Sequence, residues 1–185
     1  MILMDNIIRE GQPTLRQKAI ELKFPLSDET KQLAGDMLQF LINSQDPEIA
    51  EEYNLRGGVG IAANQVNSLD RMFAIHFKED NGEQLSFIAI NPKIVSHSVE
   101  STYLSNGEGC LSVDRNVPGY VPRHARITVK FKTIDGEEQK MRLKGLAAIV
   151  FQHELDHLNG IMFYDRINEQ NPYAEIPNST PFDRD

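Results

Sequence analysis

The chain has 185 residues, of which 40% are apolar, and its formal net charge at pH 7 is −8. This length and composition predict a single domain spanning residues 1–185, with a core large enough to fold without disulfides. The excess of 27 acidic over 19 basic residues argues against broad, non-specific nucleic-acid binding, although it leaves room for a local basic patch.

The compartment is predicted from the cysteine count and the apolar stretches. Cys110 is the only cysteine, so no disulfide can form within the chain. The first residues lack the basic segment and long apolar segment of a signal peptide, and no stretch approaches the roughly 20 apolar residues of a membrane span. We therefore expect a cytoplasmic protein with neither a membrane nor a specific nucleic acid as partner.

A helix is predicted to begin after Ser27, which can cap it and is followed by acidic residues. Apolar residues then recur at three- and four-residue steps up to residue 41, as on the buried face of a helix. Residues 44–57 are polar and give no clear signal for a further element.

Two hairpins are predicted in the centre of the chain. Residues 72–77 and 85–90 are apolar runs that flank Asn81-Gly82, a strong turn signal. Residues 127–134 and 139–143 alternate apolar and polar side chains around Asp135-Gly136, as half-buried strands do.

After Gly145 the apolar period becomes helical, and Asn159-Gly160 predicts the end of this helix. Residues 168–185 are polar and predict a tail, either disordered or packed as an edge strand. The whole pattern predicts an α+β fold in which antiparallel sheets pack around a buried helix.

The predicted late helix contains His153-Glu154-Leu155-Asp156-His157. Residues i and i+4 lie on one side of a helix, so His153 and His157 can bind the same metal ion. Glu154 lies beside them, where a carboxylate can exchange protons with a water at the metal. This spacing predicts a metal-binding helix.

A catalytic metal site of this kind needs a third protein ligand and one open position. The third histidine of one metalloprotease class is replaced by Phe163, which excludes that class. Glu175 lies between two prolines, where a rigid helix is not expected. Asp165 is more simply a surface charge paired with Arg166. Cys110 remains, since a thiolate binds Zn or Fe(II) strongly and glycines flank the neighbouring Glu108.

Three segments together resemble the signature motifs of peptide deformylases, in that family's order. Gly58-Val59-Gly60-Ile61-Ala62-Ala63-Asn64-Gln65 matches G-x-G-x-A-A-x-Q, residues 108–112 match E-G-C-L-S, and residues 153–157 match H-E-x-x-H. The longer connections after the first helix and after Cys110 resemble the subclass common in Gram-positive bacteria (type 2). The resemblance covers nearly the whole chain.

The resemblance implies a metal-dependent hydrolase of protein biosynthesis, which removes the N-formyl group from the N-terminal formylmethionine of new polypeptides and releases formate. Cys110, His153 and His157 would bind one divalent ion, Fe(II) in the cell, with Zn or Ni able to replace it in preparations. Glu154 would act as general base and then general acid, while Gln65 and the Leu111 backbone N–H would stabilise the oxyanion.

The resemblance also implies how the substrate is held. Backbone groups around Val59, Gly60 and Gly109 would pair with the substrate peptide, and Val150 would line the methionine pocket. The expected partner is therefore an N-formylmethionyl nascent peptide, met by a monomer in transient contact with the ribosome. Arg123 also resembles a family feature, for which we expect a structural role.

Three alternatives remain at this point. A general metallopeptidase would use Glu175 as third ligand and cleave internal peptide bonds. A deformylase-like binding protein would have lost the catalytic side chains, but Glu154 and Gln65 are both present. A purely structural metal site would need four protein ligands, and His76, His97 and His124 are scattered among predicted strands and loops.

Overall fold

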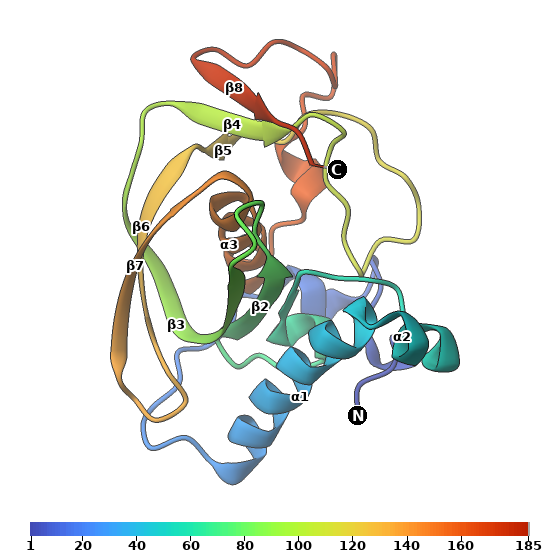
Figure 1. Ribbon diagram of the computed structural model, residues 1–185, viewed down its shortest axis with the longest axis vertical. Coiled ribbons are helices and arrows are strands. Elements are labelled where there is room, and N and C mark those ends of the chain that lie inside the picture. Colours follow the sequence, from blue (N-terminus) through green and yellow to red (C-terminus); the bar gives the residue numbers. More distant parts are fainter. Residues whose placement is uncertain (185) are drawn as a thin grey trace.

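The computed structural model describes residues 1–184 and has the α+β architecture that the sequence predicts (Figure 1). Its helices are α1 (Asp28–Gln45), α2 (Pro47–Tyr53) and α3 (Gly145–Leu158), with short 3₁₀ turns at Met4–Asn6, Pro13–Arg16, Ala63–Val66 and Phe163–Arg166. Within this part of the chain, no helix is both long and apolar enough to cross a membrane.

Five strands form a large antiparallel sheet in the order β1-β2-β3-β6-β7. They are β1 (Gly60–Ala62), β2 (Met72–Lys78), β3 (Gln84–His97), β6 (Arg126–Lys132) and β7 (Glu138–Lys144). Both predicted hairpins are present, as β2–β3 and β6–β7. The strand β3 continues beyond residue 90 into a more polar stretch, with register shifts along its pairing with β6.

A second sheet has three strands in the order β5-β4-β8. These are β4 (Ser101–Leu104), β5 (Arg123–His124) and β8 (Ser179–Phe182). The polar tail thus contributes an edge strand, which pairs in parallel with β4. The last residue of the predicted tail, Asp185, lies outside the described residues.

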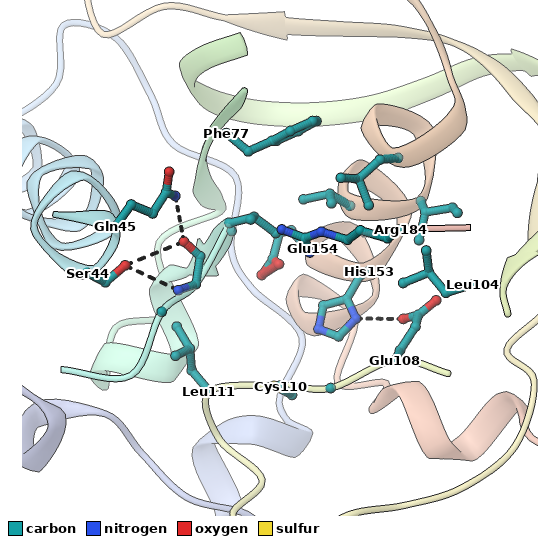
Figure 2. A pocket seen from close by; sticks show the side chains of 18 of the residues that line it. Ser44, Gln45, Phe77, Leu104, Glu108, Cys110, Leu111, His153, Glu154 and Arg184 are labelled. Carbon is teal, nitrogen blue, oxygen red and sulfur yellow. Dashed lines mark hydrogen bonds and ion pairs between the residues drawn. The ribbon is translucent and has the colours of Figure 1, made fainter. Parts of the chain in front are cut away.

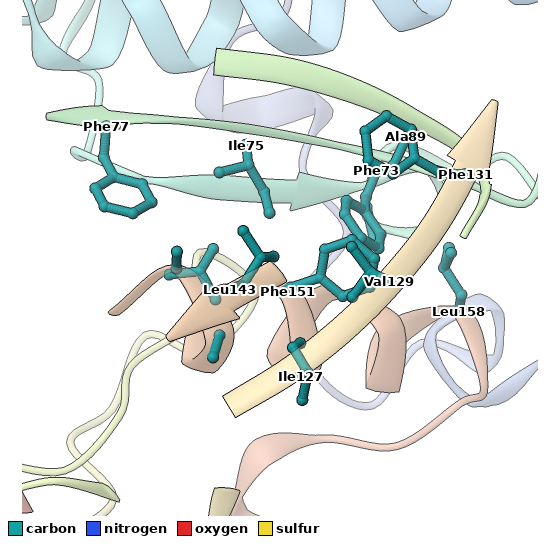
Figure 3. Packing of buried hydrophobic residues seen from close by; sticks show 14 of the residues in the cluster. Phe73, Ile75, Phe77, Ala89, Ile127, Val129, Phe131, Leu143, Phe151 and Leu158 are labelled. Atoms are coloured by element: carbon teal, nitrogen blue, oxygen red, sulfur yellow. The ribbon is translucent and has the colours of Figure 1, made fainter. Parts of the chain in front are cut away.

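The helix α3 lies between the two sheets and is buried on most of its surface. It packs against β1, β2 and β7 of the large sheet and against β4 and β5 of the small one. Phe151 meets Phe73 of β2 edge to face, with ring centroids 4.9 Å apart, among the inward side chains of β6 and β7 (Figure 3). An aromatic pair in this geometry adds to the gain from burial, so the helix is held firmly in the core.

The helix α1 covers the opposite face of the large sheet along β1, β2 and the adjoining part of β3. Ser27 caps it by accepting a hydrogen bond from the Thr30 N–H at 3.1 Å. Its buried residues, among them Met37, Phe40 and Leu41, form a second core with β2 and β3. Its C-terminal residues Ser44 and Gln45 contact the Gly58 carbonyl, just before the strand β1, so this helix also supports the site described below.

The segment 47–53, for which no element was predicted, is the short helix α2. Asp46 accepts hydrogen bonds from the N–H groups of Glu48 and Ile49, and Pro47 occupies the first helical position. These are strong local start signals. They were obscured because the helix is only seven residues long and buries none of its side chains.

Candidate metal centre

Cys110, His153 and His157 come together in the structure. The two histidines lie one turn apart on α3, and Cys110 reaches them from the segment between β4 and β5. One ligand atom from each of the three residues lies within 4.8 Å of the others, and the Cys110 Sγ is 3.2 Å from the His157 Nε2. A soft thiolate and two imidazoles at this separation fit a divalent ion such as Zn or Fe(II), with one position left open.

The segment that carries Cys110 is fixed by its backbone. The Cys110 carbonyl accepts hydrogen bonds from the Arg56 guanidinium and from the Val113 N–H. Upstream, Gly107 has φ of +79° and packs so closely on the Gly119 carbonyl that a Cβ would lie 3.0 Å from it. A side chain at residue 107 would therefore be strained in this turn.

The thiol of Cys110 is set up to ionise. Burial raises its pKa, but the positive potential of His157 and the hydrogen bonds from both imidazoles outweigh burial, and the net pKa lies well below the ordinary value. The Ser112 N–H at 3.4 Å and the Gln65 Nε2 at 3.5 Å also point at the sulfur. These contacts favour thiolate, the form of cysteine that binds metal.

His153 is oriented by Glu108, whose carboxylate lies 2.8 Å from its Nδ1 (Figure 2). This contact leaves the Nε2 of His153 as the atom available to a metal. A carboxylate on the far nitrogen is a common support for metal-binding histidines, because it fixes the ring and raises its basicity. In the sequence, Glu108 stands out for its glycine neighbours and as the first residue of the motif that contains Cys110, but neither feature predicts this contact.

Arg123 ties Glu108 to α3. Its guanidinium donates to both oxygens of Glu108, at 2.8 and 2.9 Å, and to Asp156 at 2.6 Å. Arg166 also binds Asp156, so the prediction that Arg166 pairs with Asp165 was wrong. Asp165 instead pairs with Arg16. The expected structural role of Arg123 thus has a definite form, a buried bridge between two segments.

Glu154 is 3% exposed, and its Oε1 is buried with no hydrogen-bond partner in the described part of the chain. Burial raises the pKa of this carboxyl, although the neighbouring His153 and His157 partly oppose the shift. Buried polar atoms are nearly always hydrogen-bonded, so the free oxygen indicates a place for a water or a substrate group. Gly60 makes room for this side chain, since a Cβ there would lie 2.6 Å from the Glu154 Oε2.

Gln65 is held by both ends of its amide. Its Oε1 accepts from the Ala62 N–H at 2.9 Å, and its Nε2 donates to the Ser112 hydroxyl at 3.0 Å and lies near Cys110. The amide N–H₂ group therefore points toward the metal-binding residues. The Leu111 N–H has no backbone or side-chain acceptor within residues 1–184, which leaves it available to a ligand.

His157 is supported differently from His153. Its backbone carbonyl accepts a hydrogen bond from the Asn64 Nδ2 at 2.6 Å. The His157 Nδ1 and the Asn64 Oδ1 are both buried and have no partner in the described residues. Asn64 therefore fixes the backbone at the end of α3 rather than the imidazole ring.

Cys110, His153, Glu154 and Gln65 line one pocket of about 760 Å³ (Figure 2). All the residues predicted from the sequence for substrate binding line it, namely Val59, Gly60, Gly109 and Val150. Its wall also includes residues that the sequence did not indicate: Ser44, Gln45, Arg56, Phe77, Leu104 and Arg184. They come from five separate parts of the chain, and only the fold brings them to the site.

The alternative ligands lie elsewhere. Phe163, at the position of the third histidine in one protease class, stacks on His153 with ring centroids 6.1 Å apart. Glu175 is exposed and lies on a surface hollow of the tail. His97 and His124 stack on each other, and His76 lies within hydrogen-bond distance of Ser86. None of these three histidines belongs to the metal-binding group.

Comparison with known proteins agrees with this geometry. The family model described as polypeptide deformylase matches residues 4–173. The chain is 57% identical to peptide deformylase 2 of Bacillus cereus over 184 residues, covering 100% of both chains. It is 59% identical to the peptide deformylase of Oceanobacillus iheyensis, covering 98% of this chain and 99% of the relative. A Met-Ala-Ser-bound crystal structure of the Acinetobacter baumannii enzyme superposes with a TM-score of 0.69 at 31% identity, covering 87% and 96% of the two chains.

Replacing Gly60 with alanine is expected to lower kcat strongly while the fold is kept. The new Cβ would collide with the Glu154 carboxylate, which would swing out of its position. The check is the catalytic rate together with the free energy of unfolding. Gly35→Ala is the matched control, because nothing lies within 4 Å of a Cβ there. It should leave the rate unchanged and stabilise α1 by about 1 kcal/mol. A normal catalytic rate in Gly60→Ala would show that a Cβ at this position does not displace the Glu154 carboxylate.

Acid should weaken the fold through Glu108. Burial opposes its ionisation, but Arg123 and His153 outweigh burial and hold its pKa at about 2, against 4.5 ordinarily. A carboxyl with a depressed folded pKa contributes stability that is complete above pH 4.5 and lost as the pH falls toward 2. The contribution is about 3 kcal/mol. In Glu108→Gln, the free energy of unfolding should fall less steeply between pH 4.5 and 2 than in the original protein. The control is Glu138→Gln, an exposed position, which should keep the original pH dependence. If both variants showed the same dependence of unfolding free energy on pH, Glu108 would not be the group responsible.

Proposed function

This chain belongs to the polypeptide deformylase family, and from that premise we propose which of its residues carry out each part of the reaction. Members of the family remove the formyl group from the N-terminal formylmethionine of new polypeptides, by hydrolysis. The observation that carries the proposal is the meeting of Cys110, His153 and His157 within 4.8 Å, beside a buried Glu154 whose Oε1 has no partner among residues 1–184.

Cys110, His153 and His157 would hold one divalent ion. When bound, the ion supplies Lewis-acid chemistry, since it lowers the pKa of a coordinated water toward neutrality. The thiolate makes the donor set suitable for both Zn and Fe(II). We assign Fe(II) as the ion in the cell, with Zn or Ni as replacements in purified protein.

The substrate would bind as an extended strand along β1. This strand is the edge of the large sheet, with β2 as its only neighbour in the described structure. The Val59 carbonyl pairs with His76 of β2, so the backbone groups of the next residue, Gly60, face the pocket. Gly109 lines the other side, and Leu146, Ile149 and Val150 offer an apolar wall for the methionine side chain.

Glu154 would move the proton. Its raised pKa and free oxygen suit a general base, which takes a proton from the attacking water and later gives it to the departing amine. Gln65 Nε2 and the Leu111 N–H would donate to the formyl oxygen as negative charge develops on it. A donor of this kind lowers the activation free energy by roughly 2.7–4 kcal/mol. The products are formate and a free N-terminal methionine.

The assigned residues lie between residues 59 and 157, and both sheets and α3 contribute to the pocket. This supports one catalytic domain spanning residues 1–185. Formylated N-termini arise during protein synthesis, so we place the reaction in the cytoplasm, in a monomer that contacts the ribosome transiently.

Glu154→Gln should abolish most formate release while the metal stays bound. The amide keeps the shape of the carboxylate but cannot accept the proton, so the rate should fall by about 10²–10⁴-fold. The measurement is formate release from a short formylmethionyl peptide, with metal content determined on the same sample. Glu138→Gln, at the exposed end of β7, is the control. A normal rate in Glu154→Gln would refute the acid–base role.

Cys110→Ala should lose the metal. Two imidazoles alone hold a divalent ion much more weakly than two imidazoles and a thiolate. Metal analysis after dialysis is the check, with circular dichroism to show that the fold persists. Stoichiometric metal in this variant would remove Cys110 from the ligand set without affecting the assignment of Glu154.

The identity of the ion is tested by reconstitution. Protein loaded anaerobically with Fe(II) should turn over faster than protein loaded with Zn, and exposure to air should remove the advantage. Equal rates for the two forms, at equal metal content, would contradict the assignment of Fe(II).

A further inference from the structure

One face of the large sheet carries a dense group of cations, although the whole chain is acidic. We call it the basic face, and it consists of Lys93, Arg126, Lys130, Lys132, Lys140, Arg142 and Lys144. These are seven of the 19 lysines and arginines of the chain. The strands β3, β6 and β7 contribute them, at the left of the molecule in Figure 1.

Strand register places these cations on the same face. Across the β6–β7 pair, Arg126 lies opposite Lys144 and Lys130 lies opposite Lys140, while Lys93 of β3 lies opposite Lys130. The alternating residues of these strands, such as Val129 and Leu143, point inward to the core under α3. The basic face is therefore the outer side of the sheet, and all its cations are exposed except Lys130, which is half-buried.

Most of these charges are not neutralised by neighbours. Arg126 pairs with Glu100 at 2.8 Å, and Lys130 lies 4.0 Å from Glu138. For the other five cations, the described residues provide no carboxylate within ion-pair distance. Two anions against seven cations leave a positive field on this face, against a net charge of −8 for the molecule.

A surface hollow of about 470 Å³ lies at one end of the basic face. Arg126, Arg142 and Lys144 line it, together with the hydroxyls of Ser96 and Thr128, which are register partners on β3 and β6. A hollow lined by guanidinium groups and hydroxyls suits the oxygens of a phosphate group.

We propose that the basic face binds the phosphate backbone of structured RNA, without reading its sequence. A broad array of cations with hydroxyls fits repeated phosphates, which dominate the affinity of such contacts. The strands β6 and β7 contribute no large exposed apolar side chain, and β3 contributes only Val95, as judged over the described residues, so the face lacks the aromatic and long aliphatic anchors of a membrane surface. Sequence-independent binding agrees with the expectation of no specific nucleic-acid partner.

The location of the basic face suits the reaction. It lies on the side of the large sheet away from α3, so bound RNA would leave the pocket at β1 open. The machinery that makes new polypeptides is largely RNA, and contact with it would hold the protein where formylated N-termini emerge. The RNA contact itself is independent of the assignments in the pocket.

The test measures binding of the whole protein to a fluorescently labelled RNA hairpin, by polarisation, between 50 and 200 mM salt. The affinity should fall steeply with salt. Lys140→Gln/Lys144→Gln should bind roughly tenfold or more weakly at 100 mM salt, with a slope of log K against log salt reduced by about 1.5. Lys18→Gln/Lys31→Gln is the matched control, since it removes two exposed lysines outside the basic face and changes the net charge equally. Its affinity should stay within twofold of the original.

Both double variants should release formate from a short formylmethionyl peptide at the original rate, which also shows that they are folded. Absence of salt-dependent RNA binding by the original protein would overturn the proposal. An equal loss in both variants would overturn it too, because the effect would then come from net charge alone. Binding to phosphatidylserine vesicles but not to the hairpin would assign the face to membranes instead.

Discussion

The buried guanidinium of Arg123 is the interaction on which the site depends. Arg123 is 4% exposed, and it joins Glu108, on the segment that carries Cys110, to Asp156, on the helix that carries both histidines. Burying three charges costs several kcal/mol per ion, and the cost is offset only because every charge has short, well-directed partners. Because Arg123 bonds these two segments together, it fixes the distance between the Cys110 sulfur and the imidazoles of His153 and His157. Removal of one partner would leave the others charged in the interior, so the bridge is retained as a whole or lost as a whole.

The same bridge separates the behaviour of two nearby carboxyls. Glu108 is surrounded by Arg123 and His153 and stays ionised down to about pH 2. Glu154, on the next residue of α3 after His153, faces the pocket without such a partner, and burial raises its pKa. Glu108 can therefore orient His153 permanently, while Glu154 is free to gain and lose a proton. Enzymes commonly divide roles in this way between two carboxyls of one pocket, because different surroundings push their pKa values apart.

The sequence predicted the parts of the fold that repeat a local pattern. The hairpins β2–β3 and β6–β7 follow from Asn-Gly and Asp-Gly turns, and α3 follows from its apolar period with His153 and His157 on one side. It also predicted Cys110 as their partner, from chemistry and from the resemblance of three motifs. It did not predict the bridge from Arg123 to Glu108 and Asp156, because these partners are 15 and 33 residues away and an ion pair leaves no periodic trace. The strand β1 has three residues, too few for a local signal. The tail was open between disorder and an edge strand, because β8 pairs with a strand nearly 80 residues earlier and no local pattern decides between the two.

The open edge of β1 has a consequence for which polypeptides can reach the pocket. A strand with one free side attracts the backbone of any other strand, including the edges of folded domains and of sister molecules. Here the free side is only three residues long, and the end of α1, the Cys110 segment and α3 surround it. A folded domain is too wide to enter this recess, whereas a single extended chain end is thin enough. Enclosure of this short edge therefore favours unfolded chain ends over folded domains, and it also disfavours edge-to-edge pairing of two copies of the protein.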